Sequence, residues 1–274
     1  TRENSILVKI LNKANRLLYS RAKKIIVVGR DMKQLLERKT AGLNGKAGKI
    51  PIDVIPNWAE LEQVAPLPRN ENFLLEELNI KEKFVFLYAG NMGYPNDLES
   101  ILECAEKLNN DARFHFVFLG TGVKRKWLEK TVSEKNLSNV SLLEPKPRSE
   151  QKNFLNACDV GVVSLVKKMW GVSMPSRTYN ILAAGKPILA LTENDSELAK
   201  VVTEDNIGWT VLPNNPEELL KTIYRIYEEL PHLPQKGQNA RISALENYSL
   251  SRAVARYKKA FNSNASDNEK EWDS

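Results

Sequence analysis

The chain has 274 residues, of which 42% are apolar and 27% are charged, so it can bury one large core or two modest ones. Its 40 Lys and Arg residues are interspersed with 34 Asp and Glu residues, and the net charge of +6 therefore gives no indication of nucleic acid binding. Cys104 and Cys158 have no partner spacing, which predicts neither a disulfide framework nor a zinc site. No apolar run approaches the length of a membrane span. We therefore expect a globular cytoplasmic protein.

The N-terminal part is predicted to form a piece of one α/β domain. Apolar residues recur on one face of residues 5–20, which predicts an amphipathic helix. A strand at 24–28, a helix at 31–38 and a strand at 50–55 are expected to follow. Because the chain starts at Thr1 rather than at a methionine, we expect it to be a fragment of something longer.

Beyond a polar, Pro-rich linker at 57–75, strands and helices are predicted to alternate regularly. The expected strands lie at 84–89, 114–119, 140–143, 160–165 and 188–191, and the expected helices at 97–108, 126–135, 149–157, 175–184, 217–229 and 249–261. Strands that are apolar throughout and are separated by helices imply a parallel sheet covered on both faces. The predicted fold class is α/β, with a doubly wound, Rossmann-like parallel sheet.

These segments set the predicted domain boundaries. We expect a partial first domain at 1–56, the linker at 57–75, the Rossmann-like domain at 76–240, a C-terminal helix at 241–261 and a disordered tail at 262–274. The C-terminal helix is expected to pack back toward the first domain.

Two glycine-containing turns follow the first two strands of the Rossmann-like domain. Ligands of open parallel sheets bind beyond the carboxyl ends of the strands, which is where these turns lie. Gly90, Asn91, Met92 and Gly93 form the first turn, and Gly120 and Gly122 flank the second. Because glycines lack side chains, backbone N–H groups can approach an anion there. The alternative is a tight turn between strand and helix with no ligand.

The segment from Gly171 to Pro187 has the clearest helix signals. Ser173 or Ser176 is a candidate N-cap, and Gly185 can adopt the left-handed conformation that ends a helix. Arg177 falls in the first turn, where a cation is unfavourable unless an anion is present. An arginine can form paired, charge-assisted hydrogen bonds with phosphate oxygens. We therefore predict a diphosphate site here, against the alternative of an arginine that is solvated at a helix end.

Several motifs in order resemble family 4 glycosyltransferases, which have the GT-B fold of two Rossmann-like domains. The matching segments are Val54-Ile55-Pro56-Asn57, Tyr88-Ala89-Gly90-Asn91-Met92-Gly93, Phe118-Leu119-Gly120-Thr121-Gly122, Ala157-Cys158-Asp159-Val160, Pro175-Ser176-Arg177 and Ala183-Ala184-Gly185-Lys186-Pro187. The resemblance implies that residues 76–240 form the donor-binding domain. It also implies that 1–56 is a remnant of the acceptor domain, most of which is missing.

The resemblance further implies roles for individual residues. The Gly90 turn approaches the diphosphate, and Arg177 is the basic phosphate ligand. The backbone of Pro145, Lys146 and Pro147 meets the nucleobase. Many members carry two glutamates eight positions apart, the second of which contacts the ribose, whereas this chain has Val172 and Asn180 there. We therefore expect a variant subfamily with Pro-Ser-Arg in place of that pair, in which Asn180 meets the ribose.

The implied activity is transfer of a hexose from a UDP- or GDP-linked sugar to a glycan or lipid-linked acceptor, in cell-surface polysaccharide biosynthesis. The reaction would retain the anomeric configuration and need neither a metal nor a cofactor. Arg177 would act as the catalytic group by stabilising the departing diphosphate. Two alternatives stay open, namely a GT-B nucleotide-sugar epimerase and a non-catalytic nucleotide-binding fragment. The basic residues of the first helix also leave open a peripheral contact at the inner face of the membrane.

Overall fold

The computed structural model describes residues 6–42, 44–45 and 48–262. The chain divides into two compact units. The first contains residues 1–56, 171–174 and 253–274, and the second contains 57–170 and 175–252. Residues 263–274 of the predicted tail lie outside the described residues. Among those that are described, no helix combines the length and the apolar composition that crossing a membrane requires.

The first unit contains the helices and strands predicted for the N-terminal part. They are α1 (Ile6–Arg21), β1 (Ile25–Val27), α2 (Arg30–Thr40) and β4 (Ile52–Val54), and β1 pairs with β4 in parallel. A small antiparallel hairpin of β2 (Asn44–Gly45) and β3 (Gly48–Lys49), which the sequence did not predict, lies between them in the chain. α11 (Leu250–Asn262) belongs to this unit from Ala253 onward.

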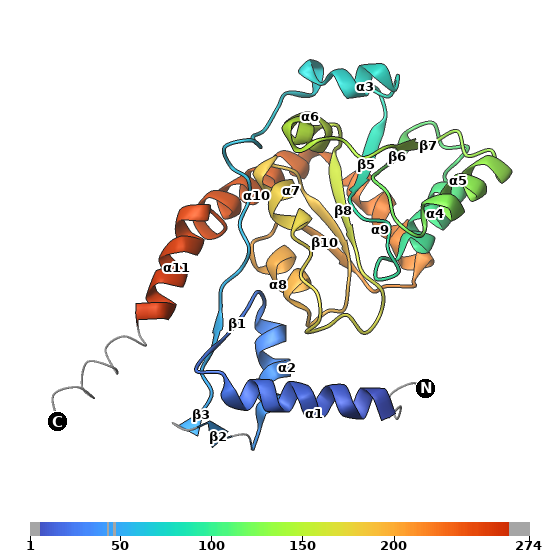
Figure 1. Cartoon of the computed structure of the whole chain (residues 1–274). Coiled ribbons are helices and arrows are strands. Elements are labelled where there is room, and N and C mark those ends of the chain that lie inside the picture. The colour runs from blue at the N-terminus through green and yellow to red at the C-terminus, as the bar shows by residue number, and fades with distance from the viewer. Residues whose placement is uncertain (1–5, 43, 46–47, 263–274) are drawn as a thin grey trace, which may run out of the picture. The chain divides into compact units, whose positions relative to one another are not determined.

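The second unit is built on a parallel sheet of six strands in the order β10-β9-β8-β5-β6-β7 (Figure 1). Its strands are β5 (Phe84–Ala89), β6 (Phe114–Leu119), β7 (Val140–Leu143), β8 (Val160–Ser164), β9 (Ile188–Leu191) and β10 (Gly208–Val211). The predicted parallel sheet is confirmed, and β5, β6, β7 and β9 have the predicted bounds. β6, β8 and β9 are buried along their whole length, and β5 is buried except at its last residue, because helices cover both faces.

Alternate residues of the strands face different helices. Phe84 and Phe86 of β5 point into the main core, which they share with α4 (Leu98–Lys107) and α9 (Pro216–Glu228). Gly161 of β8 faces the other way, where a Cβ would lie 2.7 Å from Ile181 of α7 (Arg177–Ala183). α10 (Leu233–Asn247) packs on α7. The sheet is therefore doubly wound, as predicted.

The remaining helices are short or cover the ends of the strands. They are α3 (Phe73–Glu77), α5 (Arg125–Glu134), α6 (Gln151–Asn156) and α8 (Glu197–Glu204), together with the 3₁₀ turns η2 (Arg69–Glu71), η3 (Arg148–Glu150) and η4 (Leu230–His232). η2 and the start of α3 fall within the stretch predicted to be linker.

Besides the 3₁₀ turns η2 and η4, the sequence did not predict the helices α3, α8 and α10 or the strand β10 of the second unit. α10 carries Pro234 in its first turn and Gly237 in its interior, and glycine disfavours a helix by about 1 kcal/mol relative to alanine. A close backbone approach explains this glycine, since a Cβ at Gly237 would lie 2.5 Å from the carbonyl oxygen of Gly185. Tertiary packing therefore overrides the weak local preference.

Candidate functional site

A pocket of about 620 Å³ opens beyond the carboxyl ends of β5 and β6, entirely within the second unit. Its walls come from five places in the chain: residues 57–60 of the predicted linker, the turn after β5, the turn after β6, the segment from 145 to α6, and the start of α7. This is the edge at which ligands of parallel sheets bind, and the volume suits a nucleotide-sized ligand.

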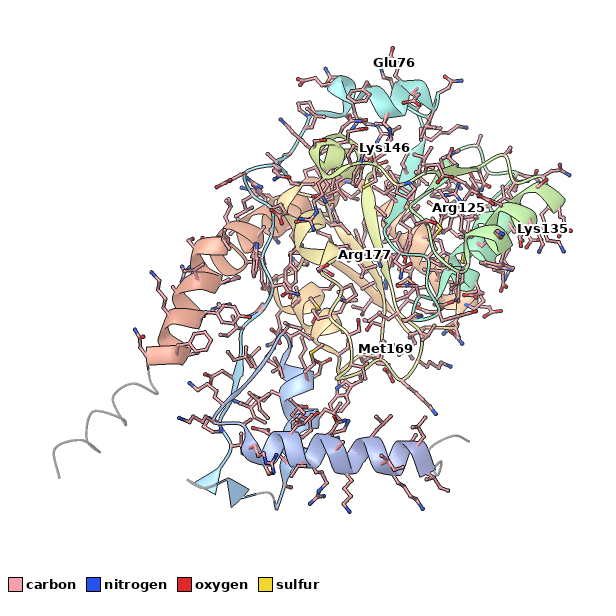
Figure 2. The ribbon with its side chains drawn as sticks, viewed as in Figure 1. Glu76, Arg125, Lys135, Lys146, Met169 and Arg177 are labelled. Atoms are coloured by element: carbon pink, nitrogen blue, oxygen red, sulfur yellow. The ribbon has the colours of Figure 1, made fainter. Side chains whose placement is uncertain are left out.

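Arg177, labelled in Figure 2, is one of the cations that line this pocket. Its guanidinium lies over the ring of Tyr88, with Cζ 4.6 Å from the ring centroid. On another side it packs against Gly90, where a Cβ would lie only 2.9 Å from the same Cζ. Its Nη1 is buried and has no hydrogen-bond partner in the described part of the chain. A buried donor without a partner carries a desolvation cost, which an anionic ligand would offset.

The sequence around α7 explains how Arg177 is held. Ser176 is the N-cap residue, although its side chain makes no capping hydrogen bond, and the helix starts at Arg177 rather than at the predicted residue 175. At the other end, Gly185 has φ +65°. The amides of Gly185 and Lys186 donate to the carbonyls of Leu182 and Ile181, which is a Schellman motif. The predicted helix stop at Gly185 is thus confirmed.

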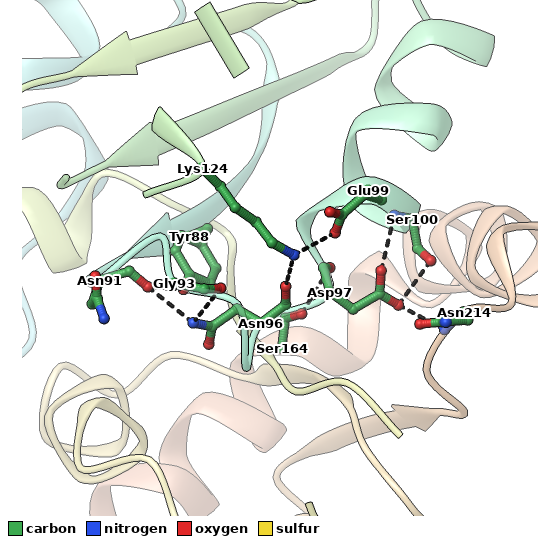
Figure 3. A network of polar contacts seen from close by, with 10 residues as sticks. All are labelled: Tyr88, Asn91, Gly93, Asn96, Asp97, Glu99, Ser100, Lys124, Ser164 and Asn214. Carbon is green, nitrogen blue, oxygen red and sulfur yellow. Dashed lines mark hydrogen bonds and ion pairs between the residues drawn. The ribbon is translucent and has the colours of Figure 1, made fainter. Parts of the chain in front are cut away.

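The turn after β5 is fixed by a polar network (Figure 3). The carbonyl oxygen of Asn91 accepts hydrogen bonds from the hydroxyl of Tyr88 (2.7 Å) and from Nδ2 of Asn96 (3.0 Å). Nζ of Lys124 donates to the carbonyl of Asn96 and pairs with Glu99 at 2.8 Å. Burial raises the pKa of the Tyr88 phenol, an effect that the charge of Arg177 partly opposes. Tyr88 is therefore a neutral donor at neutral pH.

Asp97 continues this network into α4 and toward the neighbouring loops. Its carboxylate accepts from the amide and the hydroxyl of Ser100, as an N-cap does, and from the amide of Asn214. Its carbonyl accepts from the hydroxyl of Ser164, at 2.7 Å. The first glycine turn is consequently held on several sides without contribution from a ligand.

The turn after β6 is held by one arginine that the sequence did not single out. Nη1 of Arg125 donates to the carbonyls of Gly120 (3.1 Å) and Leu143 (2.7 Å), and Nη2 donates to Glu144 at 3.2 Å. Its side chain is only 11% exposed. Arg125 looks in sequence like any polar residue at a helix start, so only the fold reveals that it joins two strand ends.

Asn180 connects α7 to the predicted linker. Its Oδ1 accepts a hydrogen bond from the amide of Glu60 at 3.0 Å, and its Nδ2 donates to Oε1 of Gln151 at 3.2 Å. Asn180 also lines the pocket. Part of its hydrogen-bonding capacity is nonetheless used to hold the protein's own chain.

The structure brings together most of the predicted site residues but not all of them. The residues that line the pocket are Gly90, Asn91, Gly120, Pro145, Lys146, Ser176, Arg177 and Asn180, whereas Met92, Gly93, Gly122, Pro147 and Ser173 do not line it. Met92 is fully buried in the core, and Ser173 belongs to the first unit. Sequence reasoning gave no site role to the lining residues Asn57, Trp58, Arg148, Gln151 and Phe154. Asn57 ends one of the motifs quoted above, whereas the other four follow no motif and reach the pocket only through the fold.

No group of three or more His, Cys, Asp and Glu side chains that could hold a metal ion occurs among the described residues. His115, for example, is buried in β6, where its Nε2 lies 2.8 Å from Oγ of Ser141. Burial, together with the charge of Lys83, lowers its pKa to about 4. His115 is thus a neutral residue of the core rather than part of the pocket.

The sequence pattern of the family described as Glycosyl transferases group 1 matches residues 70–243, which include the six-stranded sheet and most of the residues that line the pocket. The chain therefore belongs to the glycosyl transferases group 1 family. Its six-stranded parallel sheet is that of GT-B glycosyltransferases.

Individual relatives agree with this assignment. The chain is 32% identical over 227 residues to the probable glycosyltransferase WbjE of Pseudomonas aeruginosa, covering 83% of this chain and 55% of that protein. It is 26% identical over 171 residues to the putative colanic acid biosynthesis glycosyl transferase WcaI of Escherichia coli K12, covering 61% of this chain and 42% of that protein. The chain thus spans about half the length of the curated relatives it matches.

Among solved structures, HepE of Anabaena in complex with UDP is similar with a TM-score of 0.78 at 14% identity, over 96% of this chain and 70% of that one. At this identity the likeness concerns the fold.

Proposed function

We propose that this chain is the donor-binding part of a glycosyltransferase, which holds a nucleotide diphosphate sugar in the pocket beside Arg177. The buried, unpartnered Nη1 of Arg177 carries the proposal, because it is a cationic donor in a pocket wall with no partner among the described residues. Gly90 and Gly120 line the same pocket, and the missing side chain at Gly90 leaves room for the guanidinium of Arg177. Membership of the glycosyl transferases group 1 family supports the same ligand class.

The chemistry follows from where charge develops. In the proposed transfer, the bond between the anomeric carbon and the diphosphate oxygen breaks, and its electron pair stays on that oxygen. A hydroxyl oxygen of the acceptor forms the new bond to the anomeric carbon, and its proton passes to the departing diphosphate or to solvent. The guanidinium of Arg177 would stabilise the growing charge on the diphosphate, and such electrostatic contributions are typically worth about 3–4 kcal/mol per donor.

The nucleotide is proposed to be UDP or GDP, with UDP as the first to be tested. HepE, which shares the fold, was solved with UDP. The base would lie against the segment of Pro145 and Lys146, and the ribose near Asn180, since all three residues line the pocket. Val172 and Asn180 support assignment to the variant subfamily with Pro-Ser-Arg, which we keep as part of the proposal.

Calorimetry tests this proposal directly. We expect UDP or GDP to bind the wild-type chain, and Arg177→Ala to lower the affinity at least about tenfold, which corresponds to about 1.4 kcal/mol. Arg177→Lys should recover part of the loss, because a lysine keeps the charge but cannot form paired hydrogen bonds. Arg252→Ala, which removes an exposed arginine on α11, is the matched control and should bind like the wild type. Unchanged affinity in Arg177→Ala contradicts the proposal.

The finer properties of the reaction are proposals for the complete protein. We propose retention of the anomeric configuration, activity without a metal, and a glycan or lipid-linked acceptor in polysaccharide biosynthesis. The named relatives WbjE and WcaI support the general process. Product analysis by NMR with EDTA present tests the stereochemistry and the metal together. An epimerised nucleotide sugar as the product would favour the epimerase, and nucleotide binding without turnover would favour a binding fragment.

We also propose a peripheral contact of α1 with anionic lipid. The apolar residues Ile6, Leu7 and Ile10 are 58–76% exposed, and Lys9 and Lys13 are on the same helix. Co-sedimentation with phosphatidylglycerol vesicles tests it. Equal recovery with phosphatidylcholine vesicles, or with none, contradicts an electrostatic contact.

A further inference from the structure

Tyr88 is the penultimate residue of β5 and one of the largest fully buried side chains of the described chain. It is 1% exposed and does not line the pocket, so it has the burial of an ordinary core residue. Two of its contacts, however, go to groups that do line the pocket. These are the guanidinium of Arg177 and the backbone of Asn91.

The ring of Tyr88 packs against one face of the Arg177 guanidinium. The guanidinium carbon lies 4.6 Å from the ring centroid, within the range of a cation–π contact. Gly90 bounds the guanidinium elsewhere, since a Cβ there would come within 2.9 Å of Cζ and 3.1 Å of Nη1. The aromatic face attracts the cation. Nη1 of Arg177, which is buried and has no hydrogen-bond partner in the described part of the chain, remains available to a ligand.

The hydroxyl of Tyr88 fixes the adjacent turn. It donates to the carbonyl oxygen of Asn91 at 2.7 Å, and Nδ2 of Asn96 donates to the same oxygen at 3.0 Å (Figure 3). A carbonyl oxygen repels phosphate, so two donors that hold this one reduce the chance that it turns toward a bound anion. The same side chain thus orients both the cation and the turn beside it.

We infer that Tyr88 is a positioning residue for phosphate binding, which holds Arg177 through its ring and the Asn91 carbonyl through its hydroxyl. The inference rests on the proposed function, because it assumes that the pocket takes a nucleoside diphosphate. It assigns to Tyr88 a role that an ordinary core tyrosine does not have. An ordinary core residue would change the stability of the fold, whereas this residue also changes how strongly the phosphates contribute to binding.

The readout is the ratio of the affinities for UDP and uridine, measured by calorimetry on the whole chain, with GDP and guanosine as the parallel pair. Tyr88→Phe keeps the ring and removes the hydroxyl, and we expect it to lower the ratio about threefold, in line with the loss of one hydrogen bond. Tyr88→Leu removes both contacts and should lower the ratio roughly tenfold or more. The affinity for the nucleoside alone should change little in either variant.

Two further variants keep the test decisive if Tyr88→Leu does not fold. Asn96→Ala removes the second donor to the Asn91 carbonyl and should resemble Tyr88→Phe in the diphosphate-to-nucleoside ratio. Tyr179→Phe is the matched control, because Tyr179 is equally buried at 1% but packs on Tyr248, with ring centroids 4.7 Å apart, rather than on Arg177. It should leave the ratio unchanged. Urea unfolding of each variant separates loss of stability from loss of phosphate binding.

The outcomes distinguish the inference from the function on which it rests. If the wild-type chain binds neither diphosphate more tightly than its nucleoside, the proposed function fails. If the wild type shows this preference and Tyr88→Phe and Asn96→Ala both keep it in full, the inference about Tyr88 is wrong while the function stands. Equal loss of nucleoside and diphosphate binding would likewise overturn it, because that pattern reports a structural role.

Discussion

The turns after β5 and β6 look alike in sequence, since each carries two glycines after an apolar strand, yet they use their first glycine for different purposes. Both first glycines have positive φ, +146° at Gly90 and +135° at Gly120. A Cβ at Gly120 would overlap the carbonyl oxygen of Gly90, so this glycine lets two backbones meet. A Cβ at Gly90 would instead meet the end of the Arg177 side chain.

The two turns are also held in different ways. The Gly90 turn is anchored from its own strand and loop by Tyr88 and Asn96. The Gly120 turn is anchored from the following helix by Arg125, whose Nη1 donates to the backbone carbonyls of Gly120 and Leu143. We conclude that a glycine motif alone does not distinguish a glycine kept for packing from one kept beside a functional side chain. The atom that a Cβ would meet does distinguish them.

The largest effect is expected from Gly120→Ala. The backbone of Gly90 cannot move aside as a side chain can, so the new methyl group must push the two turns apart. We expect a loss of about 4 kcal/mol in the free energy of unfolding, at the upper end of single substitutions. Urea unfolding followed by circular dichroism measures it. A loss below about 1 kcal/mol would show that the close approach of the two backbones is not required.

Gly90→Ala should have a smaller effect on stability and a larger one on the site. The methyl group meets a flexible guanidinium, so the cost is mainly the strain of alanine at positive φ, about 2–3 kcal/mol. Displacement of Arg177 should lower nucleoside diphosphate affinity at least about tenfold. Unfolding and calorimetry on the same preparation give both values. If stability falls as far as in Gly120→Ala, the distinction between the two glycines fails.

The smallest expected effect is on the pH dependence of stability, and it concerns β5 and β6, the strands that precede the two turns. β6 carries His115 directly opposite Val85 of β5. Because burial lowers the pKa of His115 from 6.5 to about 4, the folded state binds fewer protons than the unfolded state between these values. Stability is therefore full above pH 6.5 and is lost as the pH falls toward 4.

We expect this loss to be about 1–2 kcal/mol between pH 7 and pH 5. His115→Gln, which can still bond with Ser141, should remove that part of the pH dependence. Urea unfolding at both pH values compares the variant with the wild type. Equal pH dependence in the two proteins would mean that other groups are responsible. The exposed His232 provides the control, since its replacement should leave the wild-type pH dependence in place.

Local sequence signals predicted the sheet and the helix stop well. The strands β5 and β6 were found with their bounds because they are continuous apolar runs between turn residues. Gly185 was recognised because only a few residue types end a helix in the left-handed conformation. Such features depend on residues that are close together in the sequence, and they can therefore be predicted from it.

Features that depend on distant residues could not be predicted in this way. The bond from Glu60 to Asn180 joins residues 120 positions apart, and Arg125 meets Leu143 across 18 positions. The pocket-lining position of Trp58 likewise follows from how the linker runs over the second unit. None of these contacts produces a periodic pattern or a characteristic spacing in the sequence, because each one depends on which distant segments the fold brings together.

The contact of Gly237 with Gly185 has a consequence for variation far from the pocket. Gly185 closes the helix that begins with Arg177. Two features of α10 support this closure: Nη1 of Arg241 donates to the carbonyl of Ala183 at 2.6 Å, and the backbone of α10 comes close to Gly185 at Gly237. A backbone support offers no graded adjustment, since any residue larger than glycine must displace one helix or the other. Position 237 does not line the pocket, yet a single methyl group there would displace the helix that begins with Arg177 and would thereby change the pocket from a distance.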